Sequence, residues 1–351
     1  MRRDVLLSGA VVATWVVCMA VTGLAGRAAD NLVAALTMVF GSFVAGSTPQ
    51  GGGAVAFPVF TKLLGVAAAD ARTFSLSIQA IGMGAASLAI ALTGRAVDRN
   101  ALRLTVPWAI VGYLVGFLLF SVVAPPSAPL KVLFTLVVVA AGLATWTTRN
   151  RPAGGRAAVV LTEQTEWWIA TAAVLGGLAS SLFGSGADVA TYLVLTIVLG
   201  LRPSIGVATS VVTMAAVSVV GLAVSLLTGA LSIAPAAGID VFGMWIAAIP
   251  VVVIGAPLGS WFASRVSPRL LVRFIAALAG LELLSTMLFL DELRTDPTLG
   301  VFAVVGLVLT GLAVRRAASI GERFTSAASR RAHTAEPMFP PSPAILEEVP
   351  S

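Results

Sequence analysis

A glycine-rich break inside an apolar run limits what this chain can fold into more than any other feature. The break is Gly46-Ser47-Thr48-Pro49-Gln50-Gly51-Gly52-Gly53, with apolar residues from Leu32 to Ala45 before it and from Ala54 to Gly65 after it. Each flank is shorter than the roughly 20 residues that a helix needs to cross a bilayer. Pro49 and the glycines would end a helix between the flanks. Irregular backbone at that depth is tolerated only where it is buried in protein or lines a cavity, so the segment is predicted to be a broken intramembrane helix.

The second half of the chain repeats the pattern. Ser180-Ser181-Leu182-Phe183-Gly184-Ser185-Gly186-Ala187-Asp188 also lies between two apolar runs, and a shift of 133 residues places Gly51 on Gly184 and Gly53 on Gly186. Interrupted apolar segments at corresponding positions of two halves are the best indication in a sequence of a transport site. We therefore interpret the chain as two related repeats.

Composition identifies the class of protein. The 351 residues are 58% hydrophobic and 11% charged, whereas soluble domains contain about 25% charged residues. A polytopic, all-α membrane protein is expected. The pI near 10.6 does not indicate nucleic-acid binding here, because the basic residues lie in loops between spans and in the tail. Cys18 and His333 are the only residues of their kinds, so neither a disulfide framework nor a Cys/His metal site is predicted.

The hydropathy pattern predicts about eight full crossings and two re-entrant hairpins, with nine or ten crossings as the alternative. The expected crossings are near 5–26, 73–94, 104–123, 128–147, 204–228, 240–262, 270–290 and 298–314, and the hairpins near 32–66 and 167–200. The corresponding division of the chain is a first helix (1–26), a first repeat (30–148), a cytoplasmic linker (149–166), a second repeat (167–314) and a disordered cytoplasmic tail (315–351).

The arginines predict the topology. If both broken segments return to the side from which they enter, all the basic loops lie in the cytoplasm together with both termini, as the positive-inside rule requires. The loops near Pro125 and Ala234 and the acidic segment Asp291–Asp296 are then external. This arrangement makes the two hairpins enter from opposite sides, so the halves form an inverted-topology repeat whose tips meet near the middle of the membrane. The arginines that it places in the cytoplasm are Arg2, Arg3, Arg95, Arg99, Arg103, Arg149, Arg151, Arg156, Arg265, Arg269, Arg273, Arg315 and Arg316.

The predicted tips contain groups that can bind an anion. Half-helices that begin at Ala54 and Ala187 would present backbone N–H groups and positive dipole ends, and glycines allow an oxyanion to approach the backbone. The competing interpretation is that the glycines allow close helix packing and the hydroxyls bind nearby carbonyls. The candidate substrate-binding residues are Ser47, Thr48, Gln50, Gly51, Gly52, Gly53, Ser181, Gly184, Ser185 and Gly186 at the tips, with Ser75, Gln79, Thr209 and Ser210 on the long helices that follow them.

Two acids within apolar segments, Asp188 and Glu282, are candidates for coupling, because intramembrane carboxylates are costly. Asp188 could carry a proton, help to hold a cation, or only cap the half-helix. Glu282 could relay protons or pair with a polar group on a neighbouring helix. Since no hydrolytic, metalloprotease or Walker motif is present, we predict neither an enzyme nor a cofactor.

The residues Gly46…Gln50-Gly51-Gly52-Gly53-Ala54-Val55-Ala56-Phe57-Pro58, Gly184-Ser185-Gly186 and Gly206-Val207-Ala208-Thr209-Ser210 resemble the TauE/SafE sulfite exporter family. The resemblance covers about residues 30–315. It implies a transporter of small sulfur-containing anions or organosulfonates, such as sulfite and sulfoacetate, in the inner (plasma) membrane of a bacterium.

The leading hypothesis from the sequence is a secondary transporter of a small anion, most simply a sulfur oxyanion of the sulfite, thiosulfate or sulfoacetate class, bound between the two tips. A gradient must drive it, because no ATPase motif is present, and protons are a possible coupling ion. The alternatives are an anion-selective channel, whose tips would form a selectivity constriction, and a non-transporting membrane scaffold. The sequence leaves the substrate, the direction of transport and the oligomeric state open.

Overall fold

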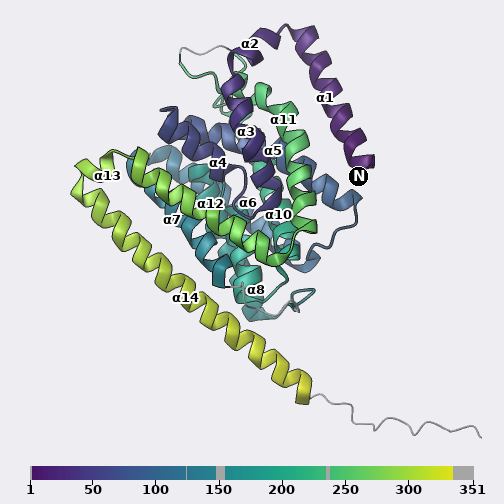
Figure 1. The fold of residues 1–351 in the computed structure, drawn as a ribbon, viewed down its shortest axis with the longest axis vertical. Coiled ribbons are helices and arrows are strands. Elements are labelled where there is room, and N and C mark those ends of the chain that lie inside the picture. Colours follow the sequence, from purple (N-terminus) through teal and green to yellow (C-terminus); the bar gives the residue numbers. More distant parts are fainter. Residues whose placement is uncertain (1, 124, 148–154, 235–237, 335–351) are drawn as a thin grey trace, which may run out of the picture.

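The computed structural model describes residues 2–123, 125–147, 155–234 and 238–334. Most of these residues are helical (Figure 1). In chain order the elements are α1 (Arg2–Thr22), α2 (Ala25–Asp30), α3 (Leu32–Ser47), α4 (Gly53–Pro58), the π-helical turn η1 (Val59–Leu63), α5 (Ala68–Leu92), α6 (Arg99–Val122), α7 (Ser127–Thr147), α8 (Glu163–Phe183), α9 (Ala187–Tyr192), the π-helical turn η2 (Leu193–Val198), α10 (Pro203–Leu227), α11 (Val241–Arg265), α12 (Pro268–Phe289), α13 (Glu292–Thr295) and α14 (Pro297–Thr334).

Within the described residues, eight helices are long and apolar enough to cross a membrane. These are α5, α6, α7, α8, α10, α11, α12 and α14. Many large apolar side chains on their outer faces are exposed, for example Leu118, Leu258 and Val304, as expected for surfaces that contact lipid. The prediction of an all-α, polytopic membrane protein is confirmed.

The set of eight differs from the predicted one at two helices. The helix predicted to extend to Gly26 ends at Thr22, because Gly23 adopts a positive φ of 68°. Its apolar part, Ser8–Thr22, is shorter than the eight helices that are long enough to cross a membrane. The first arm of the second hairpin, α8, is longer than predicted at 21 residues. Thr162 and Thr165 form a capping box that starts α8 upstream of the apolar run.

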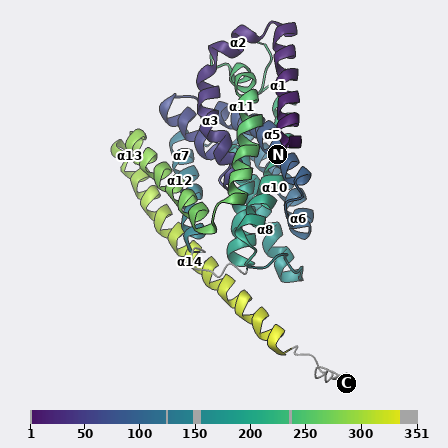
Figure 2. The same ribbon diagram turned by 45° about the vertical axis from the view of Figure 1, so that its right-hand side comes forward.

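The tail prediction is wrong for residues 315–334. Helix α14 continues to Thr334 and extends past the other helices (Figure 2). This segment is rich in alanine and arginine, which favour helix, so a polar composition did not end the helix. Residues 335–351, the rest of the predicted tail, lie outside the described part of the chain.

The first hairpin leaves and returns at one end of the molecule. Helix α3 runs in the same direction as α11, since Asn31 donates to Asp240 before both helices begin and Gly259 packs on Phe43 near the end of both. The chain then turns back through α4 and η1. Helix α5, which follows, runs parallel to α11, because Trp245 near the start of α11 donates to the carbonyl of Ser77 in α5, and Arg95, just after α5, donates to Ser260 near the end of α11. The hairpin therefore returns to the end at which α11 begins. We call this the outer end, in accordance with the predicted topology.

The second hairpin leaves and returns at the opposite end. Helix α8 begins in a core cluster with Val159 and Ala101, and Leu199, just beyond η2, packs in that same cluster. Arg95, shortly before α6, donates to the carbonyl of Ser260 close to the C-terminal end of α11. This inner end is therefore the one at which α11 finishes, and the two hairpins have opposite orientations.

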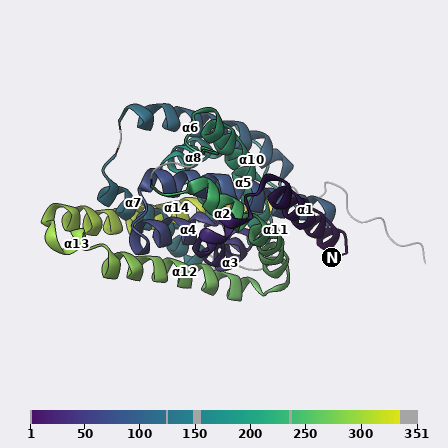
Figure 3. The same ribbon diagram turned by 90° about the horizontal axis from the view of Figure 1, so that it is seen from above.

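The first arm of each hairpin packs on a helix of the other repeat. A β-carbon at Gly259 of α11 would collide with the carbonyl of Phe43 in α3, and one at Gly112 of α6 would collide with the carbonyl of Val174 in α8. Helices α6 and α8 therefore form one side of the molecule, and α3 lies on the other (Figure 3). These reciprocal crossings support the proposal of two inverted repeats.

An ion pair at the outer end connects α2 to the start of α11. Arg27 donates to both carboxylate oxygens of Asp240, at 2.6 Å each, and Asp240 also accepts from the backbone N–H of Gly243 at 2.8 Å. The hydrogen bond from Arg27 lowers the pKa of the Asp240 carboxyl. Asp240 thus holds the entrance of the first hairpin against α11.

The inverted arrangement predicts which loops a membrane-impermeant thiol reagent reaches. Exposed positions 96 and 157 lie at the inner end, and 127 and 232 at the outer end. With Cys18→Ser as background, Ala96→Cys and Ala157→Cys should be labelled only from the cytoplasm, and Ser127→Cys and Ser232→Cys only from outside. The second hairpin and the single crossing α10 lie between positions 157 and 232, so labelling of these two positions from the same side would show that the second broken segment crosses the membrane instead of returning.

Candidate functional site

The two hairpin tips contact each other in the interior of the molecule. The Ser185 hydroxyl donates to the carbonyl of Gln50 at 3.2 Å. A β-carbon at Gly51 would lie 2.9 Å from Oε1 of Gln79 and 3.1 Å from Oγ of Ser185, and would overlap Oδ2 of Asp188. Gly51 has a φ of 68°, so it provides both the turn and the close approach that only glycine allows.

Two of the four candidates on the long helices belong to this cluster. From α5, Gln79 donates through Nε2 to the carbonyl of Gly184 at 2.6 Å and to Oγ of Ser75 at 2.9 Å. Ser75 in turn donates to the same carbonyl at 3.3 Å. With both amide hydrogens used in this way, the Oε1 atom of Gln79 faces Gly51.

The other two, Thr209 and Ser210, are engaged elsewhere. The Thr209 hydroxyl accepts from the backbone N–H of Asp98 at 3.0 Å, in the loop that precedes α6. The Ser210 hydroxyl donates to the carbonyl of Val207 within its own helix at 2.9 Å. No described hydrogen bond joins either residue to a tip, so their assignment to the site stays a prediction without support from the geometry.

At the first tip the hydroxyls satisfy local carbonyls, as in the competing interpretation. Ser47 donates to Phe43 at 2.7 Å and Thr48 donates to Val44 at 3.0 Å. Gln50 instead reaches away from its own hairpin. Its Nε2 atom lies 3.4 Å from the carbonyls of Val138 in α7 and Ile275 in α12, so this side chain links the tip to that helix pair.

At the second tip the N–H groups expected to face an anion are already bound by the protein. Oδ1 of Asp188 accepts from Gly186 at 3.1 Å and from Val189 at 2.9 Å. The backbone N–H of Ala187 donates to the Ser180 hydroxyl at 2.9 Å. The expectation of unpaired donors at this half-helix was therefore wrong in the state described, and the alternative role of Asp188 as a cap is the one observed. The sequence reasoning missed Ser180 as a partner.

Three acceptor oxygens at the tips have no hydrogen-bond donor among the described residues. They are Oδ2 of Asp188, Oε1 of Gln79 and Oε1 of Gln50, and all three residues are buried. The first two lie beside the same point, the position that a β-carbon on Gly51 would occupy. Buried polar atoms without partners are rare in native proteins, so these oxygens are available to accept from a proton donor, a water molecule or a ligand.

An arginine near the second tip was also missed. Arg72, close to the start of α5, donates through Nη1 to the carbonyl of Ser181 at 3.1 Å. The Ser181 hydroxyl donates to Leu178 within α8 at 2.6 Å. An arginine among the first residues of an otherwise apolar helix was the signal in the sequence that could have indicated it.

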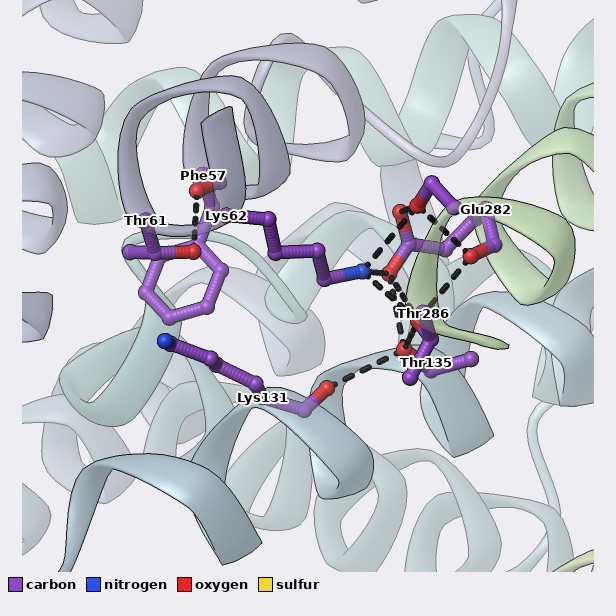
Figure 4. Close-up of polar contacts among 8 residues, drawn as sticks. Phe57, Thr61, Lys62, Lys131, Thr135, Glu282 and Thr286 are labelled. Atoms are coloured by element: carbon purple, nitrogen blue, oxygen red, sulfur yellow. Dashed lines mark hydrogen bonds and ion pairs between the residues drawn. The ribbon is translucent and has the colours of Figure 1, made fainter. Parts of the chain in front are cut away.

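A second buried polar cluster joins the return arm of the first hairpin to α7 and α12 (Figure 4). Nζ of Lys62 lies 2.5 Å from Oε1 of Glu282, and the two side chains are only 1% and 3% exposed. Thr135 and Thr286 complete the cluster, with Thr135 donating to Oε1 of Glu282 at 2.7 Å. Glu282 thus pairs with a polar group of a neighbouring element, which is the structural alternative considered for it. Lys62 was missed, although a lysine within an apolar arm was a signal.

Two cavities lie away from the tips. One, of about 500 Å³, is an apolar cleft between α1 and α11 that includes Trp15 and Trp245. The other, of about 190 Å³, lies at the inner end beside Arg95, Trp261 and Arg265. Neither is lined by a tip residue.

The chain matches a known protein family. The family model described as "Sulfite exporter TauE/SafE" matches residues 33–286, which is more than half of the 351 residues. The matched region includes both hairpins, the contact between their tips and the Lys62–Glu282 pair. Comparisons with curated proteins and with solved structures gave no match. The chain belongs to the sulfite exporter TauE/SafE family.

Proposed function

We propose that the protein is a secondary transporter that binds a small sulfur oxyanion or organosulfonate between the two hairpin tips. Membership of the family implies a membrane transporter of sulfur compounds. The observation that supports the specific site is the contact between Ser185 and Gln50, because it joins two broken helices that enter from opposite ends. A site at such a junction can open alternately toward each side when one repeat moves against the other.

The first tip provides the approach for the anion. Gly51 and Gly53 have no side chains on the side that faces Ser185 of the second tip, so an oxyanion can approach their backbone N–H groups. The positive end of the half-helix adds a favourable interaction. The hydroxyl of Ser185, which now donates to Gln50, is the neutral donor of the second tip that is nearest to this point.

Protons are our proposed coupling ion, with Asp188 as the carrier. A proton would turn Oδ2 of Asp188 into a donor, and Oε1 of Gln79, which lies beside the same face of Gly51, is an acceptor that otherwise lacks one. It would also remove the negative charge that repels a substrate anion at the same tips. Glu282, the other coupling candidate, is paired with Lys62, so we assign it a different role. The family, the long apolar helices and the basic inner loops support a bacterial inner-membrane location.

The purified protein in proteoliposomes tests this proposal. We expect uptake of radiolabelled sulfite that saturates with concentration, responds to an imposed pH gradient and accelerates when unlabelled sulfite is present on the opposite side. Unlabelled thiosulfate and sulfoacetate should compete to different degrees and so define the substrate. Large ohmic currents without acceleration by opposite-side substrate would indicate a channel, and the absence of flux for every sulfur anion would contradict the proposal.

A further inference from the structure

We propose that the cluster around Lys62 is a second anion site, between the outer end and the tips, in which the carboxylate of Glu282 occupies the place of the transported oxyanion. The inference rests on the proposed function for the identity of the ligand, a small sulfur oxyanion. Its structural basis is independent of the tips. It depends on the donors around Glu282, on the charge of the cluster and on a comparison with the second hairpin.

One ammonium and three hydroxyls lie around the carboxylate of Glu282. Oε1 accepts from Nζ of Lys62 at 2.5 Å and from Oγ1 of Thr135 at 2.7 Å. The hydroxyls of Ser285 and Thr286 lie 3.2 and 3.4 Å from the carboxylate oxygens, and their shorter bonds, at 2.8 and 3.0 Å, go to the backbone carbonyl of Glu282. The ammonium and the Thr135 hydroxyl are donors that also suit a sulfite or sulfonate group, because both ligands present negatively charged oxygens to charged and neutral donors.

The cluster contains an excess of positive charge. Lys62 and Lys131 are the only lysines in the chain, and Lys131 is close enough for its charge to act on Lys62. In Figure 4 the Lys131 side chain lies beside the cluster and is turned away from Glu282. Two ammonium groups and one carboxylate leave one positive charge, which a single monovalent anion such as bisulfite would neutralise.

The fold itself does not require this ion pair. The corresponding turn of the second hairpin, η2, has the sequence Leu-Val-Leu-Thr-Ile-Val and contains no charged residue. Replacement of a buried ion pair by apolar residues is often neutral or stabilising. A lysine buried in the apolar arm is therefore better explained by a ligand than by stability of the hairpin.

Lys62 lies between the outer end and the hairpin tips, where a second anion site would be on the route from external solution to the tips. Lys62 follows the first helical residue of the return arm, Gly53, by nine positions, which is about 14 Å along a helix at 1.5 Å per residue. The chain emerges at the outer end directly afterwards, at Gly65. An anion that replaces Glu282 on Lys62 would thus lie between external solution and the tips, on the arm that leads to them.

Two single variants and their combination distinguish an anion site from a structural ion pair. Glu282→Gln leaves Lys62 without its carboxylate, so half-maximal binding should need less sulfite. Lys62→Gln, alone or combined with Glu282→Gln, removes the ammonium and should raise the required concentration about ten-fold or more. Binding is measured on purified full-length protein as the sulfite-dependent rise in unfolding temperature, with Lys131→Gln as a lysine variant outside the direct contacts. We expect a smaller effect from Lys131→Gln.

A purely structural pair gives a different pattern. Each single variant would then lower the unfolding temperature, the double variant would recover it, and sulfite would act equally on Glu282→Gln and the double variant. That result would overturn the inference. The binding measurement does not need flux, so a wild-type protein that binds sulfite through Lys62 but transports no sulfur anion would contradict the proposed function and leave this inference intact.

Discussion

Gly51→Ala should reduce sulfite flux to the background of empty liposomes while the protein still inserts in the membrane. The added methyl group would overlap Oδ2 of Asp188 and lie 2.9 Å from Oε1 of Gln79, so it would force the two tips apart. The positive φ of Gly51 adds about 1–2 kcal/mol of backbone strain for an L-residue. Flux is measured in proteoliposomes with radiolabelled sulfite, and insertion is checked by the amount of reconstituted protein.

The neighbouring glycine provides a matched control. A β-carbon at Gly52 would meet its nearest atoms at 3.3 and 3.5 Å, in Ala45 and Gly41, and the φ of Gly52 is −67°. Gly52→Ala should therefore retain most of the flux. Equal activity of the two alanine variants would mean that the contact between the tips is not part of the transport site.

Asp188→Asn should separate sulfite exchange from proton-driven accumulation. The Asn Oδ1 atom can still accept from Gly186 and Val189, as Asp188 does now, so the half-helix keeps its cap. The Asn Nδ2 atom would take the place of the protonated oxygen as a donor beside Gly51. The variant therefore mimics the protonated state, and we expect exchange to persist while uptake against a gradient is lost at every pH.

The alanine variant tests the capping role by itself. Asp188→Ala removes the acceptor of two backbone N–H groups and should lower stability by about 0.5–2 kcal/mol, measured by thermal unfolding in detergent. If Asp188→Asn shows the same pH dependence as the wild type, Asp188 does not carry the coupling proton.

The glycine-rich breaks could be found from the sequence because they depend on local chemistry. A proline together with a run of glycines disfavours helix, and the helices are interrupted at residues 48–52 and 184–186. The contact between the tips followed from the arginine distribution, which constrains topology. That argument gave the orientation of the hairpins, although it could not give the register at which Gly51 faces Asp188.

The partners of individual polar residues could not be predicted, because they depend on packing between distant segments. Lys62 and Glu282 are 220 positions apart, and nothing near either residue in the sequence indicates the other. The hydrogen-bond partner of Thr209 was missed for the same reason as Lys62 was missed, since that partner is distant in the sequence. The place of Thr209 on the helix after the second hairpin suggested the site, but its hydroxyl accepts from the backbone N–H of Asp98.

The predicted ends of α8 and α14 were wrong because they were based on hydropathy alone. Hydropathy marks only the apolar part of a helix, whereas capping and helix propensity determine where it begins and ends. The capping box at Thr162 therefore lengthened α8. Likewise, the alanine-rich segment after Arg315 continued α14.

The most direct test of the central claim, that both tips hold one anion, is to locate the anion. Selenite is an analogue of sulfite whose selenium atom can be identified by anomalous diffraction. In crystals of the full-length protein grown with selenite, we predict an anomalous peak between Gly51 of the first hairpin and Ser185 of the second, within hydrogen-bonding distance of both. Bound selenite that contacts neither tip would contradict the account.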